Sequence, residues 1–204
     1  MTSAEAITAF TALFVVIDPI GLAPLFVALT RGRSARARWF IGLRACAVAA
    51  VLLILFTLAG EALLNFIGIS MPAFRIAGGL LLFLTALDML FDRRTKRRED
   101  TADQPHAPGD DDPSVFPLAL PLIAGPGAIA TMILLADGAD AFGIAAAIGV
   151  MLGVLALVLA LFALAGPMER LLGPVGTNVV TRLLGMLLAA LSVQFVVDGA
   201  LAIW

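Results

Sequence analysis

The sequence predicts an all-α membrane protein whose six transmembrane helices form two three-helix repeats of inverted topology. Of its 204 residues, 61% are hydrophobic and 14% are charged, whereas a soluble domain is about 45–50% apolar and about 25% charged. Six apolar stretches are long enough to cross a hydrocarbon core about 30 Å thick. The two halves of the chain also match each other at a nearly constant offset.

Polar residues and prolines mark the ends of the six predicted spans. Arg31 to Ser34 end the first span, and Ser70 followed by Pro72 opens the third as a helix cap with a first-turn proline. Thr177 and Asn178 are expected to open the sixth in the same way. The spans are predicted at residues 5–30, 40–60, 71–91, 115–136, 141–165 and 178–203.

The basic residues predict the orientation of the chain. The loops after the first, third and fifth spans hold 10 of the 13 Lys and Arg residues, and the opposite loops and both termini hold none. Because Lys and Arg are enriched in short cytoplasmic loops, both termini are predicted on the outer face. The hydrophilic segment 92–114, basic at its start and acidic later, is predicted to be a disordered cytoplasmic linker.

The linker separates two segments, 1–91 and 115–204, that resemble each other. Pro19 and Pro126 are 107 residues apart, as are Arg75 and Arg182. Glu61 is 108 residues from its match, Glu169, so one inserted residue accounts for the difference. Each repeat holds three spans, an odd number, so the second copy must enter the membrane from the opposite side. Inverted repeats are characteristic of secondary transporters, whose sites lie between the copies near the midplane.

The first and fourth spans each contain a helix-breaking motif near their middle. The first holds Asp18-Pro19-Ile-Gly21, and the fourth holds Gly125-Pro126-Gly127. Proline removes a backbone donor, and glycine permits angles that other residues avoid. Both helices are therefore predicted to break near the midplane, with Asp18 capping the second half of the first span. The alternative is that these residues only kink the helices, since both are common in membrane helices.

Broken backbone at this depth predicts a binding site. Unpaired backbone groups cannot face lipid, so they must line a cavity enclosed by protein. Two half-helix N-termini attract a carboxylate, and the facing carbonyls with Asp18 attract an ammonium group. The matching ligand is a small zwitterionic amino acid. The alternative roles for Asp18 are proton coupling and a helix cap. The predicted substrate-binding residues are Asp18, Pro19, Gly21, Gly125, Pro126, Gly127 and Thr131.

Charged and small residues elsewhere in the spans suggest gates and packing faces. Arg75 and Arg182 are candidate gating residues that would pair alternately with Glu61, Glu169 or Asp198, unless each reaches out to lipid headgroups. The two glycines of Gly149-Val-Met-Leu-Gly153 are expected to pack closely against a neighbouring helix.

Three motifs resemble the MarC family, also called the small neutral amino acid transporter family. They are Asp18-Pro-Ile-Gly-Leu-Ala-Pro-Leu-Phe26, the segment from Pro121 to Ile129, and the segment from Thr181 to Phe195. The resemblance covers essentially the whole chain except the linker. It implies a six-span bacterial inner-membrane protein, in a family whose members move glycine, alanine and similar amino acids, some as exporters. In such a membrane the outer-face termini predicted from the basic residues would be periplasmic. One departure is Leu22, where many members have asparagine.

Other functional classes find little support in the sequence. The only histidine, His106, lies in the linker and the only cysteine is Cys46, so neither a metal site nor a histidine-dependent catalytic centre is expected, and no cofactor is implied. A net charge of -2 gives no attraction to nucleic acid. The expected partners are membrane lipid, the amino acid and a coupling proton or sodium ion. A channel or exporter for another small solute, or a structural membrane protein, remains as an alternative.

Overall fold

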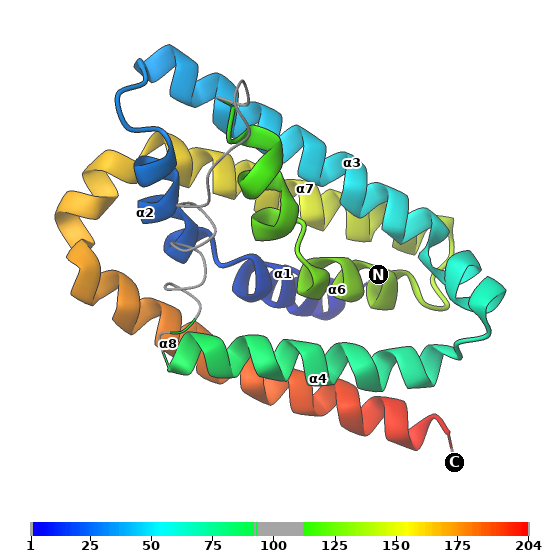
Figure 1. The fold of residues 1–204 in the computed structure, drawn as a ribbon. Helices are drawn as coiled ribbons and strands as arrows, with labels where there is room; N and C mark the ends of the chain where they lie inside the picture. The colour runs from blue at the N-terminus through cyan, green and yellow to red at the C-terminus, as the bar shows by residue number, and fades with distance from the viewer. Residues whose placement is uncertain (1, 92, 94–111, 204) are drawn as a thin grey trace.

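A computed structural model describes residues 2–91, 93 and 112–203, and every element in these ranges is helical (Figure 1). Most of the predicted linker, residues 92 and 94–111, lies outside the described residues. The all-α prediction is confirmed. The elements are α1 (Ser3–Ile17), α2 (Pro19–Leu29), α3 (Ala35–Ile67), α4 (Met71–Leu90), η1 (Ser114–Ile123), α6 (Pro126–Ala136), α7 (Ala141–Ala163) and α8 (Ala165–Leu201).

The helices provide five or six candidate membrane spans, where six were predicted. Five segments are long and apolar enough by themselves: Ser3–Leu29, α3, α4, α7 and Val175–Leu201. A sixth results if η1 and α6, which are bent by 57° relative to each other, count as one broken span.

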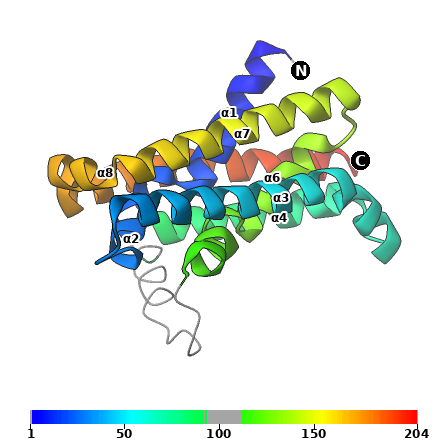
Figure 2. The same ribbon diagram turned by 90° about the horizontal axis from the view of Figure 1, so that it is seen from above.

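The helices form an inner and an outer layer. Figure 1 shows α1, α2, η1 and α6 between α3 and α7 on one side and α4 and α8 on the other. In the most apolar 18-residue stretch of Ser3–Leu29, 61% is buried, against 22–39% in the corresponding stretches of the other four long segments. Seen from above, the axes of the long outer helices are roughly aligned with one another (Figure 2). Their many exposed apolar side chains match a hydrocarbon environment.

Glycines hold α4 and α8 in close antiparallel contact. A Cβ atom built on Gly79 would lie 2.8 Å from the carbonyl oxygen of Ser192, and one on Gly185 would lie 2.9 Å from the Cβ of Met89. An earlier residue of α4, Gly79, meets a later residue of α8, Ser192, and a later residue of α4, Met89, meets the earlier Gly185. The two helices are therefore antiparallel, as Figure 1 also shows. Such close approach of helix backbones requires small residues.

The other pair of outer helices, α3 and α7, is antiparallel too. The Cys46 thiol lies 3.8 Å from the Leu155 carbonyl oxygen, and a Cβ on Gly42 would lie 3.3 Å from the Leu159 side chain. The turn at 30–34 and the end of α4 lie at one end of the bundle (Figure 1). The connections at 68–70 and 137–140 and the C-terminus lie at the other.

Three local predictions are wrong. The second helix is longer than the predicted 40–60, since α3 runs over 33 residues. Thr177 does not open the last helix: its hydroxyl donates to the carbonyl of Gly173 (3.0 Å), and the helical chain continues back to Ala165, interrupted only at Gly173 (φ 60°). Threonine can bond to the preceding turn instead of capping a helix. Gly149 and Gly153 are exposed, and a Cβ on either would have no neighbour within 4 Å.

We predict that Gly79→Ala destabilises the protein and that Gly149→Ala does not. The new methyl group at position 79 would collide with the backbone of α8, and overpacking of this kind costs about 1–3 kcal/mol. At position 149 the same change meets open space. Thermal unfolding in detergent measures both variants. Equal melting temperatures for the two would contradict the described contact between α4 and α8.

Candidate functional site

Asp18 alone separates α1 from α2. Its backbone is left-handed (φ 55°, ψ 65°), a conformation that Asp tolerates better than most residues. Its N–H donates to the Phe14 carbonyl (2.9 Å), its carbonyl accepts from the Leu22 N–H (3.0 Å), and its carboxylate accepts from the Gly21 N–H (3.1 Å). Pro19 follows at the first helical position, where its missing N–H is least costly. The buried Asp18 is therefore both the end of one helix and the cap of the next.

The interruption in the other half of the chain is longer. Ala124 and Gly125 separate η1 from α6, and Phe116 and Leu120 within η1 also have extended backbone. Each of these two precedes a proline, which disfavours the helical conformation of the residue before it. The fourth predicted span is thus irregular over a greater part of its length than the Gly125-Pro126 motif alone indicates.

The N-terminus of α6 lacks the cap that α2 has. No side chain caps this helix, and Pro126 at its first position carries no N–H. The next two residues, Gly127 and Ala128, are buried, and their N–H groups point out of the helix start without a side-chain acceptor. The first N–H of α6 that bonds locally is that of Ile129, to the Gly125 carbonyl (3.0 Å).

The two interruptions lie side by side in the inner layer. A Cβ atom on Gly127 would lie 3.1 Å from a methyl carbon of Val16, two residues before Asp18, and 3.0 Å from one of Leu82. A side chain at position 127 would therefore require the Val16 or Leu82 side chain to shift by a few tenths of an ångström. The start of α6 and the end of α1 thus meet although the motifs are more than 100 residues apart in sequence.

Thr131 lies one turn beyond Gly127 and is fully buried. Its hydroxyl donates to the Gly127 carbonyl (2.8 Å), which leaves its oxygen as an acceptor. Of the other predicted site residues, Pro19 is buried, Gly21 and Gly125 are partly buried, and Pro126 is exposed.

The two polar residues of the site, Asp18 and Thr131, are closed to solvent in this conformation. Two cavities, of about 260 and 300 Å³, open between α2, α3 and α7 and between α1 and α8, and none of the seven predicted site residues lines either of them. Because Asp18 and Thr131 have no exposed surface, a ligand can reach them only after helices move.

The two neighbouring interruptions offer opposite charge. Asp18 brings a carboxylate, whereas the start of α6 brings uncapped N–H groups and the positive end of a helix dipole. Such a pair of groups suits a ligand with an ammonium group and a carboxylate. Within the described ranges, no three or more His, Cys, Asp and Glu side chains lie close enough together to hold a metal ion.

Arg75, a predicted gating residue, forms an ion pair that sequence reasoning missed. Its guanidinium lies 2.5 Å from the carboxylate of Asp137, the residue that ends α6, and both side chains are about three-quarters buried. The expected partners were Glu61, Glu169 or Asp198. The repeat does not predict this pair, because the position that matches Asp137, 107 residues earlier, is the uncharged Thr30 at the end of α2.

The other two predicted gating residues are not joined to Arg75. Arg182 is exposed on α8 and has no ion pair with any carboxylate of the described chain. The Asp198 carboxylate accepts from the amide of Gln194 (2.7 Å), one turn earlier on the same helix.

We predict that Asp18→Ala lowers stability by about 2 kcal/mol and that Asp18→Asn costs much less. Alanine loses the cap, at about 1 kcal/mol, and is strained in the left-handed conformation by about 1 kcal/mol more. Asparagine keeps a side-chain oxygen that accepts the capping hydrogen bond, and it tolerates the left-handed backbone conformation. Thermal unfolding of the three proteins in detergent checks this order. A stable Asp18→Ala variant would show that the described cap does not hold.

Comparison with known proteins identifies the family. The model described as "MarC family integral membrane protein" matches residues 4–204. A UPF0056 membrane protein of Archaeoglobus fulgidus is 38% identical over 199 residues, which cover 93% of this chain and 89% of the relative.

Bacterial relatives are similarly close. A UPF0056 membrane protein of Aquifex aeolicus is 34% identical over 95% of this chain and 91% of its own length. The UPF0056 membrane protein YhcE of Escherichia coli is 34% identical over 93% and 89%. No solved structure matches. The chain therefore belongs to the MarC family of integral membrane proteins, in agreement with the resemblance seen in its motifs.

Proposed function

We propose that this protein is a secondary transporter of small neutral amino acids, glycine- and alanine-like, which works by alternating access in the bacterial inner membrane. Its termini would lie on the periplasmic side, and it would be able to export its amino acid substrates. The observation that carries the proposal is the meeting of two helix interruptions inside the bundle, at Asp18 and at Gly125-Pro126. In secondary transporters, discontinuous helices of this kind form the substrate site.

The packing of the helices supports an inverted repeat. If α1 and α2 match η1 and α6, then α3 matches α7 and α4 matches α8. Both matching outer pairs, α3 with α7 and α4 with α8, are in contact and antiparallel. The contact of α3 with α6 has its counterpart in α7 with α2, and that of α2 with α8 in α6 with α4. A two-fold axis in the membrane plane would produce this pattern, with the interruptions near the midplane.

The charges at the interruptions favour a zwitterionic ligand. The uncapped N–H groups of Gly127 and Ala128 would receive the ligand carboxylate, and the negative charge of the Asp18 carboxylate would favour the ammonium group. A zwitterion has no net charge, so it avoids the large cost of carrying an ion through a low-dielectric site.

The neighbours of the interruptions favour a small ligand. Gly21, Gly125, Gly127 and Ala128 provide little side-chain volume, and Leu22, fully buried, makes this region apolar. A hydrogen atom or a methyl group is the side chain that such surroundings accommodate, as in glycine and alanine.

A permanently open channel fits the structure less well. Asp18 and Thr131 are fully buried, so no continuous aqueous path passes them in this conformation. A purely structural role would leave the paired interruptions without a use, although they are costly within a membrane.

Flux through proteoliposomes tests the substrate. We expect labelled glycine and alanine to cross and labelled lysine not to cross. We also expect an imposed gradient of the coupling ion, proton or sodium, to drive accumulation of the labelled amino acid. Asp18→Asn, which keeps the helix cap, should abolish transport while the protein remains folded. No movement of either amino acid by folded protein would refute the substrate assignment, and normal transport by Asp18→Asn would reduce Asp18 to a cap.

The Arg75–Asp137 ion pair provides a test of gating. It lies at the end of the bundle that holds the 137–140 connection and joins the two repeats, so it is suited to close that end (Figure 1). We expect Arg75→Asp or Asp137→Arg to lower transport about tenfold, and the double exchange to restore most of it. Arg182→Asp, a matched control at an exposed position, should have little effect. Failure of the double exchange to rescue would contradict the gate.

A further inference from the structure

We propose that the cavity between α2, α3 and α7 binds an anionic glycerophospholipid, with its phosphate on Arg38. The cavity has a volume of about 260 Å³ and lies at the end of the bundle that holds the turn at 30–34. It is separate from the interruptions, and the proposal does not depend on transport. The residues that carry it are Phe26, Arg38, Trp39, Gly42, Leu159 and Phe162.

Two stacked aromatic rings form the base of the cavity. The ring centroids of Phe26 and Phe162 are 4.2 Å apart and their planes differ by 1°. Gly42 makes this arrangement possible, because a Cβ at that position would lie 3.4 Å from the Phe162 ring and 3.6 Å from the Phe26 ring. The base is thus rigid and apolar.

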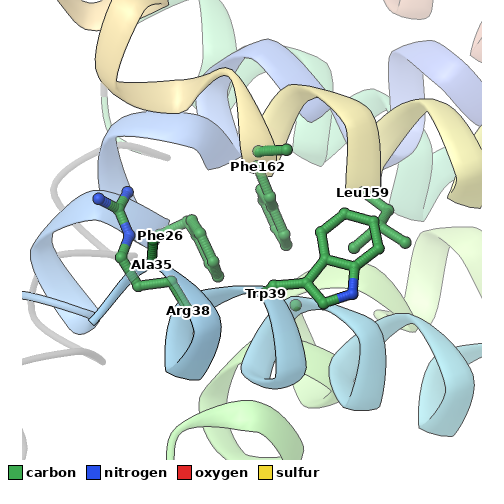
Figure 3. A pocket seen from close by; sticks show the side chains of 8 residues that line it. Phe26, Ala35, Arg38, Trp39, Leu159 and Phe162 are labelled. Atoms are coloured by element: carbon green, nitrogen blue, oxygen red, sulfur yellow. The ribbon is translucent and has the colours of Figure 1, made fainter. Parts of the chain in front are cut away.

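The guanidinium of Arg38 lies over the outer side of this base. Its central carbon is 5.6 Å from the centroid of Phe26, and Figure 3 shows the guanidinium on one side of Phe26 and the indole of Trp39 on the other. A guanidinium stacked on a ring keeps its edge N–H groups available, and these match the oxygens of a phosphate.

No carboxylate neutralises this guanidinium within the described chain. The ion pairs found there join Arg44 to Asp112 and Arg75 to Asp137, and no acidic residue lines the cavity. Arg31 and Arg36 lie within seven residues of Arg38 and add to the positive potential of this end. The site therefore favours an anion over a zwitterionic amino acid, whose ammonium group would find no partner.

The apolar part of the cavity and its surroundings indicate that the anion is a lipid. Leu159 and the two Phe rings provide an apolar surface beside the cation, as an acyl chain joined to a phosphate requires. Trp39 and Phe40 are 45% and 50% exposed on the same turn of α3. Tryptophan is enriched at the level of lipid headgroups, so the arginine lies where lipid phosphates lie.

Trp39 allows the site to be observed directly, because the chain has only one other tryptophan, Trp204. The Trp204→Phe variant of the full chain is placed in vesicles whose phosphatidylglycerol or phosphatidylcholine carries brominated acyl chains, at equal mole fraction. We expect brominated phosphatidylglycerol to quench Trp39 more, with an apparent preference of about fivefold, the effect of one arginine near an anionic headgroup.

Variants of two neighbouring arginines provide a matched control. Arg38→Gln should reduce the preference for phosphatidylglycerol over phosphatidylcholine to a ratio of about one, while Arg38→Lys should keep part of the preference. Arg36→Gln removes the same charge, but Arg36 lies over Phe40 and does not line the cavity. It should keep the preference. Circular dichroism in detergent establishes that each variant is folded.

Three results would overturn the proposal. Equal quenching by the two lipids would show that the cavity does not select an anionic headgroup. Equal effects of Arg38→Gln and Arg36→Gln would show a general surface charge effect instead of a site. Loss of the preference on addition of millimolar inorganic phosphate would assign the site to a free anion, whereas persistence supports the lipid.

Discussion

The structure depends on how it satisfies backbone groups where two helices are interrupted. Hydrocarbon offers no hydrogen bonds, so every N–H and C=O that a helix releases must find a partner within the protein. At Asp18 the chain does this locally, with bonds to Phe14, Gly21 and Leu22. At Gly125 it does so only in part, since the start of α6 has no side-chain cap. Both interruptions lie between the α3–α7 pair and the α4–α8 pair of long helices (Figure 1).

The difference between the two interruptions gives the inner layer its chemistry. One has its own carboxylate, and the other has an uncapped positive helix end, so together they offer partners for both charges of the proposed zwitterionic ligand. The contact of Gly127 with Val16 brings these unlike groups together. Antiparallel packing of the matching outer helices surrounds them, and the Arg75–Asp137 ion pair then connects the two halves at one end.

The sequence was informative where local chemistry decides the structure. Asp-Pro and Gly-Pro have few conformations open to them, so the helix starts at Pro19 and Pro126 could be located from residues alone. Tertiary choices were not accessible in this way. Gly79 and Gly149 look alike in sequence, yet one meets a backbone carbonyl and the other open space. The partner of Arg75 and the bond from Thr177 to its own helix also depend on which of several groups comes within reach.

The most direct test of this account is a disulfide between the two interruptions. Val16→Cys and Gly127→Cys are combined in a Cys46→Ala background, with a protease site added in the 92–114 linker. After cleavage, the halves should remain joined on a non-reducing gel and separate on reduction, because positions 16 and 127 are in contact. Val16→Cys with Gly149→Cys, the exposed position on α7, should not join them. Halves that separate without reductant in the first variant would show that the interruptions lie apart, and would contradict the account.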